Sequence, residues 1–133
     1  MKTAKRAYGD RGEDIATRFL VRKGYHLLER NWRVGHLEVD IIAEHFGTLV
    51  FVEVKTRRDE QFGDAAEAVD HNKQAHLIDA ARLYCYEKEE DRPMRFDIIT
   101  VVGAGETCTV RHIEGAYSPE SFSRVERARK RKL

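Results

Sequence analysis

Hydrophobic positions recur with two different periods along this chain, and each period predicts a different kind of element. Between residues 10 and 23, Ile15, Phe19 and Leu20 lie on one side at helical spacing, and Gly24 follows where a C-terminal cap is expected. A second helical pattern runs from about residue 66 to 88 and ends in the acidic run EKEED. The chain therefore contains two predicted amphipathic helices.

The other apolar segments are typical of strands. YHLLERNWRV ends at a predicted turn, LEVDIIA and TLVFVEVKTR form a predicted hairpin, and RFDIITVV and TCTVRHI flank the turn GAGE. The element order α-β-β-β-α-β-β predicts an α/β fold with a mixed five-stranded sheet flanked by helices. A length of 133 residues fits one domain over 1–133, with a basic tail at about 119–133 that leaves room for a short helix.

Composition narrows the class of protein. Hydrophobic residues make up 41% and charged residues 35%, which indicates a folded domain, whereas the formal net charge of +1 does not by itself indicate a nucleic-acid partner. The basic residues at both ends either neutralise phosphates or are simply solvated. No apolar stretch has the length of a signal peptide or a membrane helix, so we expect a cytoplasmic protein with no membrane partner. Cys85 and Cys108 are isolated and the histidines follow no ligand spacing, which argues against disulfide, zinc or histidine metal sites.

The segment Phe51-Val52-Glu53-Val54-Lys55 places two charges within an apolar strand. Side chains alternate along a strand, so Glu53 and Lys55 share one face with Leu49 and Phe51. One interpretation is an edge strand with a solvated Glu/Lys pair. The other is a functional site.

Asp40 in the preceding strand favours a functional site. If the hairpin closes through residues 45–48, Asp40 stands directly opposite Glu53, with Cβ atoms about 5 Å apart. Two carboxylates at that distance repel each other unless a cation lies between them, and oxygen ligands suit Mg²⁺ or Mn²⁺. Lys55 would then stabilise charge on a bound phosphate, so the predicted reaction is hydrolysis of a phosphodiester.

Two helical residues complete the predicted site, each with an alternative explanation. Glu13 lies at the edge of the buried stripe of the first helix and is either a third metal ligand or an acid that interacts with the helix dipole. Lys73 interrupts the apolar stripe of the second helix and is either a phosphate ligand or a snorkelling lysine. Glu38 shares a face with Asp40 and is either a supporting ligand or the partner of Arg33 or Arg57 in a salt bridge.

Several motifs in a fixed order resemble those of the YraN-type family, a bacterial group described as candidate endonucleases. They are Gly12-Glu13, Gly24-Tyr25, Arg30-Asn31-Trp32-Arg33, Glu38-Val39-Asp40-Ile41-Ile42-Ala43, Phe51-Val52-Glu53-Val54-Lys55-Thr56-Arg57 and Arg95-Phe96-Asp97. The resemblance runs from about Ala7 to Tyr117. In pattern the family is similar to the archaeal Holliday-junction resolvases of the PD-(D/E)xK, or restriction-endonuclease-like, superfamily.

The resemblance implies a restriction-endonuclease-like α/β core and a set of site residues. Glu13, Asp40, Glu53 and Lys55 match the superfamily's catalytic acids and lysine, with the three acids as ligands of Mg²⁺ or Mn²⁺. We assign contacts with nucleic acid to Lys73, Arg57 and Arg58.

Three functions remain open from the sequence. The first is a DNA endonuclease, with branched DNA as one candidate substrate and a homodimer as one candidate form. The second is a catalytically silent nucleic-acid-binding module that assists DNA processing. The third is an exonuclease or RNase of the same fold.

Overall fold

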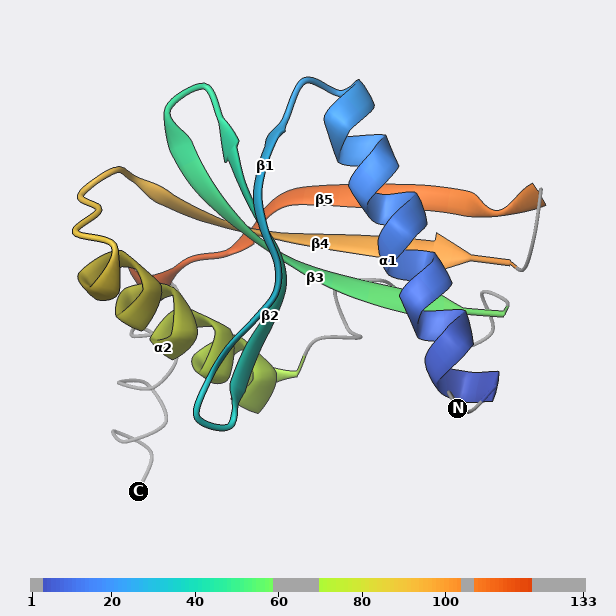
Figure 1. Ribbon diagram of the computed structural model, residues 1–133, viewed down its shortest axis with the longest axis horizontal. Helices are drawn as coiled ribbons and strands as arrows, with labels where there is room; N and C mark the ends of the chain where they lie inside the picture. Colours follow the sequence, from blue (N-terminus) through green and yellow to red (C-terminus); the bar gives the residue numbers. More distant parts are fainter. Residues whose placement is uncertain (1–3, 59–69, 104–106, 121–133) are drawn as a thin grey trace.

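Two helices and five strands make up the part of the chain that the computed structural model describes, namely residues 4–58, 70–103 and 107–120, with side chains from Arg11 onward (Figure 1). In chain order they are α1 (Ala4–Arg22), β1 (His26–Val34), β2 (Leu37–His45), β3 (Thr48–Arg57), α2 (His71–Glu87), β4 (Met94–Val102) and β5 (Thr109–Tyr117). This order and the mixed sheet confirm the predicted α/β fold class.

The helix ends differ from the sequence prediction in informative ways. Helix α1 begins at Ala4, six residues before the predicted start, and ends before Gly24, whose positive φ of 92° confirms the expected cap. Helix α2 begins at His71 because Asp70 caps it, its side chain accepting a hydrogen bond of 2.8 Å from the Lys73 backbone N–H. The predicted helical residues 66–69 and the basic tail after residue 120 lie outside the described residues.

The strands follow the sheet in sequence order, from β1 at one edge to β5 at the other. Neighbouring strands are antiparallel except β3 and β4, which are parallel and are connected through the segment that contains α2. Strand β3 is therefore the central strand, and Glu53 on it is only 4% exposed. The interpretation of Glu53 and Lys55 as a solvated pair on an edge strand is thus wrong.

Each face of the sheet carries its own apolar core. Ala16 and Leu20 of α1 pack with Val50, Val52 and Ile99 on one face. On the other face, α2 packs against a separate cluster that includes Leu49, Phe51, Phe96 and Ile98. Strand β3 supplies alternating residues to both clusters, and Glu53 continues the series that begins with Leu49 and Phe51 on the α2 face.

The hairpin of β2 and β3 has the predicted register but opens at the predicted site. Pairing runs from His45↔Thr48 to Ile41↔Val52 and stops one position before Asp40 and Glu53. Instead of a cross-strand backbone partner, the Val54 N–H donates a 2.9 Å hydrogen bond to Oδ2 of Asp40. The prediction that Asp40 pairs directly with Glu53 is therefore wrong. The two strands separate at this point, where the side-chain carboxylate of Asp40 accepts the hydrogen bond that a backbone carbonyl would otherwise accept.

Gly12 brings α1 close to β3 at the position next to Glu13. A Cβ atom on Gly12 would stand 2.0 Å from Oγ1 and 3.0 Å from Cβ of Thr56. Alanine normally stabilises a helix relative to glycine by about 1 kcal/mol. We expect Gly12→Ala to lower the free energy of unfolding by about 1–3 kcal/mol instead, because the helix must move away from the strand.

Urea denaturation of Gly12→Ala, alone and together with Thr56→Ala, measures this effect. The second substitution removes Oγ1 and Cγ2 of Thr56 and should restore part of the lost stability. A Gly12→Ala protein more stable than the wild type would show that α1 and β3 are not in tight contact.

Candidate active site

Three carboxylates from three different elements meet at the point where β2 and β3 separate. Asp40 is fixed by its hydrogen bond from Val54 N–H. Glu13 comes from α1 and Glu53 from the centre of β3, and each lies close enough to Asp40 to share a hydrogen bond with it when one of the pair is protonated. The structure therefore brings the three acids of the predicted site together, with Glu13 and Glu53 both next to Asp40.

The proximity of these acids changes their protonation. Burial and the charge of Asp40 raise the pKa of Glu53 to about 8, although Lys73 and Lys55 act in the opposite direction. Burial and the charge of Asp40 likewise raise the pKa of Glu13 to about 7, against the lowering effect of Arg30 and Asn31. Without a cation, the cluster thus holds protons at a pH where isolated carboxyl groups have lost them.

Two lysines flank Glu53. Nζ of Lys55 lies 3.6 Å and Nζ of Lys73 lies 3.7 Å from the same oxygen, Oε1 of Glu53. Lys55 comes from β3 and Lys73 from the first turn of α2, so the second helix adds a cation to the face on which Glu53 lies. The predicted proximity of Lys55 and Lys73 to the acids agrees with these distances.

The other oxygen of Glu53 is a buried acceptor without a donor. Oε2 has no hydrogen-bond partner, although buried polar atoms in native proteins nearly always have one. In the described residues, no three or more His, Cys, Asp or Glu side chains are already arranged to hold a metal ion. The three acids thus lie near one another, but their oxygens do not surround a common point at metal-ligand distances. The unpartnered Oε2 of Glu53 is the ligand atom that a cation could use.

Two residues of β1 outside the predicted site, Arg30 and Asn31, lie against Glu13. In the amide orientation that satisfies its neighbours, the side-chain nitrogen of Asn31 donates to both Glu13 oxygens, at 3.1 and 3.3 Å. Arg30 lies 4.0 Å from Oε2 of Glu13 and 2.9 Å from Oδ1 of Asp14. The motif Arg30-Asn31 was visible in the sequence, but only the fold shows that β1 passes beside α1 at this point.

Three further candidate residues, Glu38, Arg57 and Arg58, are close in sequence to Asp40 and Glu53. Glu38 pairs with Arg33 at 3.5 Å, so the salt-bridge explanation of Glu38 agrees with the structure. Arg57 ends β3, and Arg58 follows it as an exposed residue. Their assignment to nucleic-acid binding stays a prediction.

The raised pKa values predict how stability depends on pH. An acid whose pKa is raised on folding destabilises the folded state fully above its folded pKa and not at all below its unfolded pKa. With a chelator present, we therefore expect the melting temperature to fall as pH rises from about 5 to about 8.5. Circular dichroism melts of the wild type and Glu53→Gln test this, and the fall should be smaller in the variant; equal slopes would contradict the strained acid cluster.

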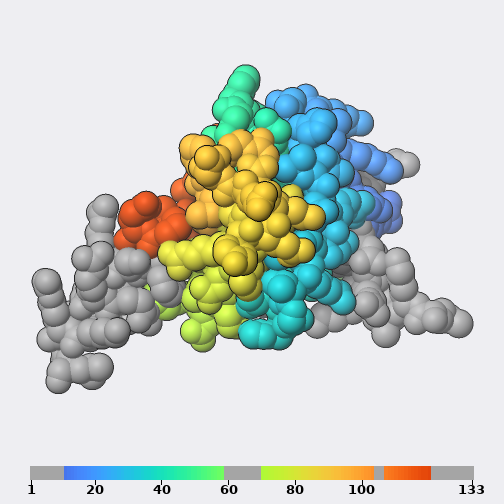
Figure 2. Space-filling model, turned by 60° about the vertical axis from the view of Figure 1, so that its left-hand side comes forward, coloured from blue at the N-terminus to red at the C-terminus, as the bar shows by residue number. Residues whose placement is uncertain are grey.

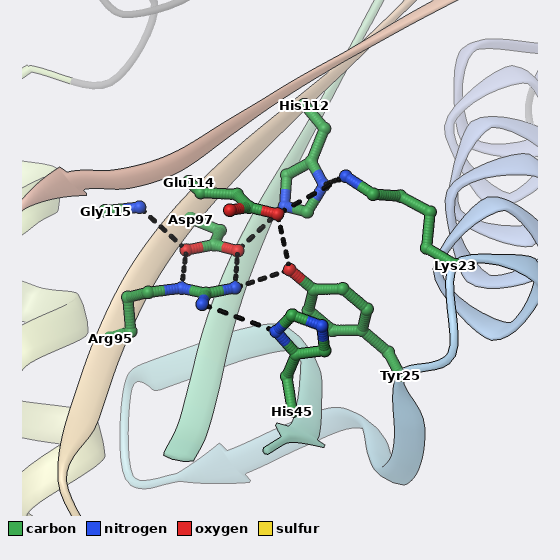
Figure 3. A network of polar contacts seen from close by, with 8 residues as sticks. All are labelled: Lys23, Tyr25, His45, Arg95, Asp97, His112, Glu114 and Gly115. Atoms are coloured by element: carbon green, nitrogen blue, oxygen red, sulfur yellow. Dashed lines mark hydrogen bonds and ion pairs between the residues drawn. The ribbon is translucent and has the colours of Figure 1, made fainter. Parts of the chain in front are cut away.

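A second polar network lies beside β4 and β5, around Asp97, which is 0% exposed (Figure 3). Nε and Nη2 of Arg95 donate to the two Asp97 oxygens at 2.9 Å each. His112 Nε2 lies 2.7 Å from Oδ2, and the Gly115 N–H donates to Oδ1 at 3.0 Å. Burial would raise the pKa of Asp97, but these hydrogen bonds outweigh it and hold the pKa below its usual value.

The network extends from Asp97 to the start of β1. Arg95 also donates to the Tyr25 hydroxyl, which in turn donates to Oε1 of Glu114 at 2.9 Å. The Tyr25 ring stacks on His45 with ring centroids 3.9 Å apart. Because every oxygen of Asp97 is already bonded to protein groups, this network is a structural connection between strands.

The fold and these contacts define an α/β protein with an acidic cluster and two lysines at the central strand of a mixed sheet. The model of the family described as "Uncharacterised protein family UPF0102" matches residues 12–101, a span that contains all four predicted catalytic residues. The chain belongs to this family, which confirms the YraN-type family that its motifs resemble.

Curated relatives cover nearly the whole chain. A UPF0102 protein of Phocaeicola vulgatus is 41% identical over 112 residues, which are 84% of this chain and 93% of the relative. UPF0102 proteins of Nitratidesulfovibrio vulgaris and Myxococcus xanthus are 44% and 40% identical, covering 88% and 85% of this chain and 88% and 90% of the relatives. Among the described helices, neither α1 nor α2 has the length and apolarity needed to cross a membrane.

Proposed function

We propose that this protein is a metal-dependent DNA endonuclease with a restriction-endonuclease-like active site. The observation that carries the proposal is the convergence of Glu13, Asp40 and Glu53 from α1, β2 and β3, with Lys55 beside them. Three neighbouring carboxylates destabilise a fold unless their charge is compensated, and a divalent cation compensates it directly. A function that uses the three carboxylates explains why the protein has them although they destabilise its fold.

The donor set fits Mg²⁺ or Mn²⁺. Both ions prefer carboxylate oxygens and keep part of their shell for water and substrate phosphate. Glu13, Asp40 and Glu53 would hold the ion, with the unpartnered Oε2 of Glu53 as one ligand atom. Such an ion neutralises charge on a phosphodiester and lowers the pKa of a bound water.

The chain's own residues supply position and charge. Val54 N–H fixes Asp40, so the central acid has one defined orientation before substrate arrives. Lys55 and Lys73 both face Oε1 of Glu53, beside the proposed ion site, and their ammonium groups would bind phosphate oxygens of the substrate there. Lys55 would stabilise the negative charge that develops on the phosphate during hydrolysis, and Lys73 would bind a phosphate of the DNA strand that is cut.

DNA is the proposed substrate, with Lys73, Arg57 and Arg58 as contacts to its phosphates. The similarity in motif pattern to Holliday-junction resolvases favours branched DNA and a homodimer, since a symmetric junction suits a symmetric enzyme.

Cleavage of a labelled set of nucleic acids tests the proposal. The set contains duplex DNA, single-stranded DNA, a flap, a four-way junction and a matched RNA, each with Mg²⁺, Mn²⁺ or chelator. We expect metal-dependent cutting within DNA by the wild type, loss of cutting in Lys55→Met with DNA binding retained, and no change in Glu87→Gln, which alters an exposed acid at the end of α2. Binding without cutting on every substrate, equal in all three proteins, would instead support a silent binding module.

A further inference from the structure

Asn31 has an unusual backbone conformation directly beside the acid cluster. Its φ is 52°, in the left-handed region that non-glycine residues rarely adopt and that asparagine tolerates best. The pairing of β1 with β2 passes from Arg30↔Ile41 to Trp32↔Val39 without a pair between Asn31 and Asp40. Strand β1 and its register thus continue through Asn31, but Asn31 itself has no backbone pair with Asp40.

The side chain of Asn31 lies against Glu13. The amide nitrogen reaches both Glu13 oxygens, at 3.1 and 3.3 Å, while the Glu13 side chain is only 14% exposed. A residue in an uncommon backbone conformation that makes specific contacts with a candidate catalytic group points to a role in that group's function.

The chemistry of the contact distinguishes Asn31 from its neighbour. Arg30 makes its shorter ion pair with Asp14, at 2.9 Å, and remains 4.0 Å from Glu13. Asn31 is a neutral donor, so it orients the carboxylate without cancelling the charge that a cation needs.

We propose that Asn31 is a positioning residue whose side-chain amide holds the Glu13 carboxylate toward Asp40 for a divalent cation. This inference rests on the proposed metal-dependent function. It adds a residue from β1 to a site otherwise built from α1, β2, β3 and α2.

Asn31→Gly separates the amide from the backbone, because glycine adopts a positive φ without strain. The matched control is Glu89→Gly, which changes another left-handed residue, φ 53°, just beyond the C-terminal end of α2. Figure 2 shows this end of α2 and the segment leading to β4, in yellow and orange, at the centre of one face of the molecule.

Calorimetric titration with MnCl₂ is the main measurement, and melting in chelator shows whether each variant is folded. We expect Asn31→Gly to melt near the wild type but to bind Mn²⁺ about 10-fold or more weakly, as when a group that orients a metal ligand is lost. Glu89→Gly should bind like the wild type, and Asn31→Gly should add little to the loss caused by Glu13→Ala.

Equal Mn²⁺ affinities of wild type and Asn31→Gly would overturn this inference and leave the proposed function standing. If the wild type binds no Mn²⁺, both the role of Asn31 and the proposed metal-dependent function are contradicted. A loss in Asn31→Gly that persists in full on top of Glu13→Ala would also contradict it, because the amide would then act through something other than Glu13.

Discussion

Glu53→Gln should abolish DNA cleavage and at the same time stabilise the protein at about pH 8 in chelator. The two effects have one cause, the burial of a carboxylate beside Asp40, which raises the pKa of Glu53 to about 8. A neutral amide of the same size removes the repulsion, so we expect a gain of about 1–2 kcal/mol in the free energy of unfolding. The same amide is a poor metal ligand, so cleavage should fall by at least about 10²–10³-fold.

Urea denaturation and single-turnover cleavage of one substrate measure the two effects on the same protein preparation. Glu87→Gln, an exposed acid on α2, should change neither. A Glu53→Gln protein that is less stable than the wild type would show that the lysines at 3.6 and 3.7 Å already compensate the carboxylate. A Glu53→Gln protein that cuts normally would remove Glu53 from the site.

Asp97→Ala should be the most destabilising single substitution among the polar residues discussed. Asp97 is fully buried and accepts hydrogen bonds from Arg95, Gly115 and His112. Its removal leaves the Arg95 guanidinium and a backbone N–H without their acceptor, which typically costs about 3–5 kcal/mol. Because the pKa of Asp97 is lowered, its stabilising contribution is complete above the unfolded pKa and is lost as pH falls.

Chemical denaturation at neutral pH checks this expectation, with Glu114→Ala as the control. Glu114 is an exposed member of the same network and pairs with Lys23 at 3.3 Å, so its loss should cost less than about 1 kcal/mol. Similar effects of the two substitutions would show that Asp97 is not the centre of the network.

The sequence predicted the elements and the proximity of the candidate site residues because both depend on short-range patterns. Helical and strand periods are local, and the loop between β2 and β3 fixes a register whose last pair, Ile41↔Val52, lies next to Asp40 and Glu53. The alternation of side chains along β3 could not show whether the face with Glu53 is exposed to solvent. That depends on α2, a helix from a distant part of the chain that packs on this face of the sheet.

Features that depend on several distant segments were missed. The opening of the hairpin at Asp40 requires a side chain to replace a backbone acceptor, which no hydrophobic pattern encodes. The contact of Asn31 with Glu13 requires β1 to pass α1 with a left-handed residue. The Asp97 network joins Tyr25, His45 and His112, which are far apart in sequence and unremarkable by type.

Anomalous diffraction from crystals soaked in MnCl₂ tests directly whether Glu13, Asp40 and Glu53 form one cation site. We expect a strong manganese peak within about 2.0–2.3 Å of oxygens from all three carboxylates, absent in Glu53→Gln crystals. No peak at these residues under saturating Mn²⁺, with Glu53 still paired with Lys55 and Lys73, would contradict the proposed site.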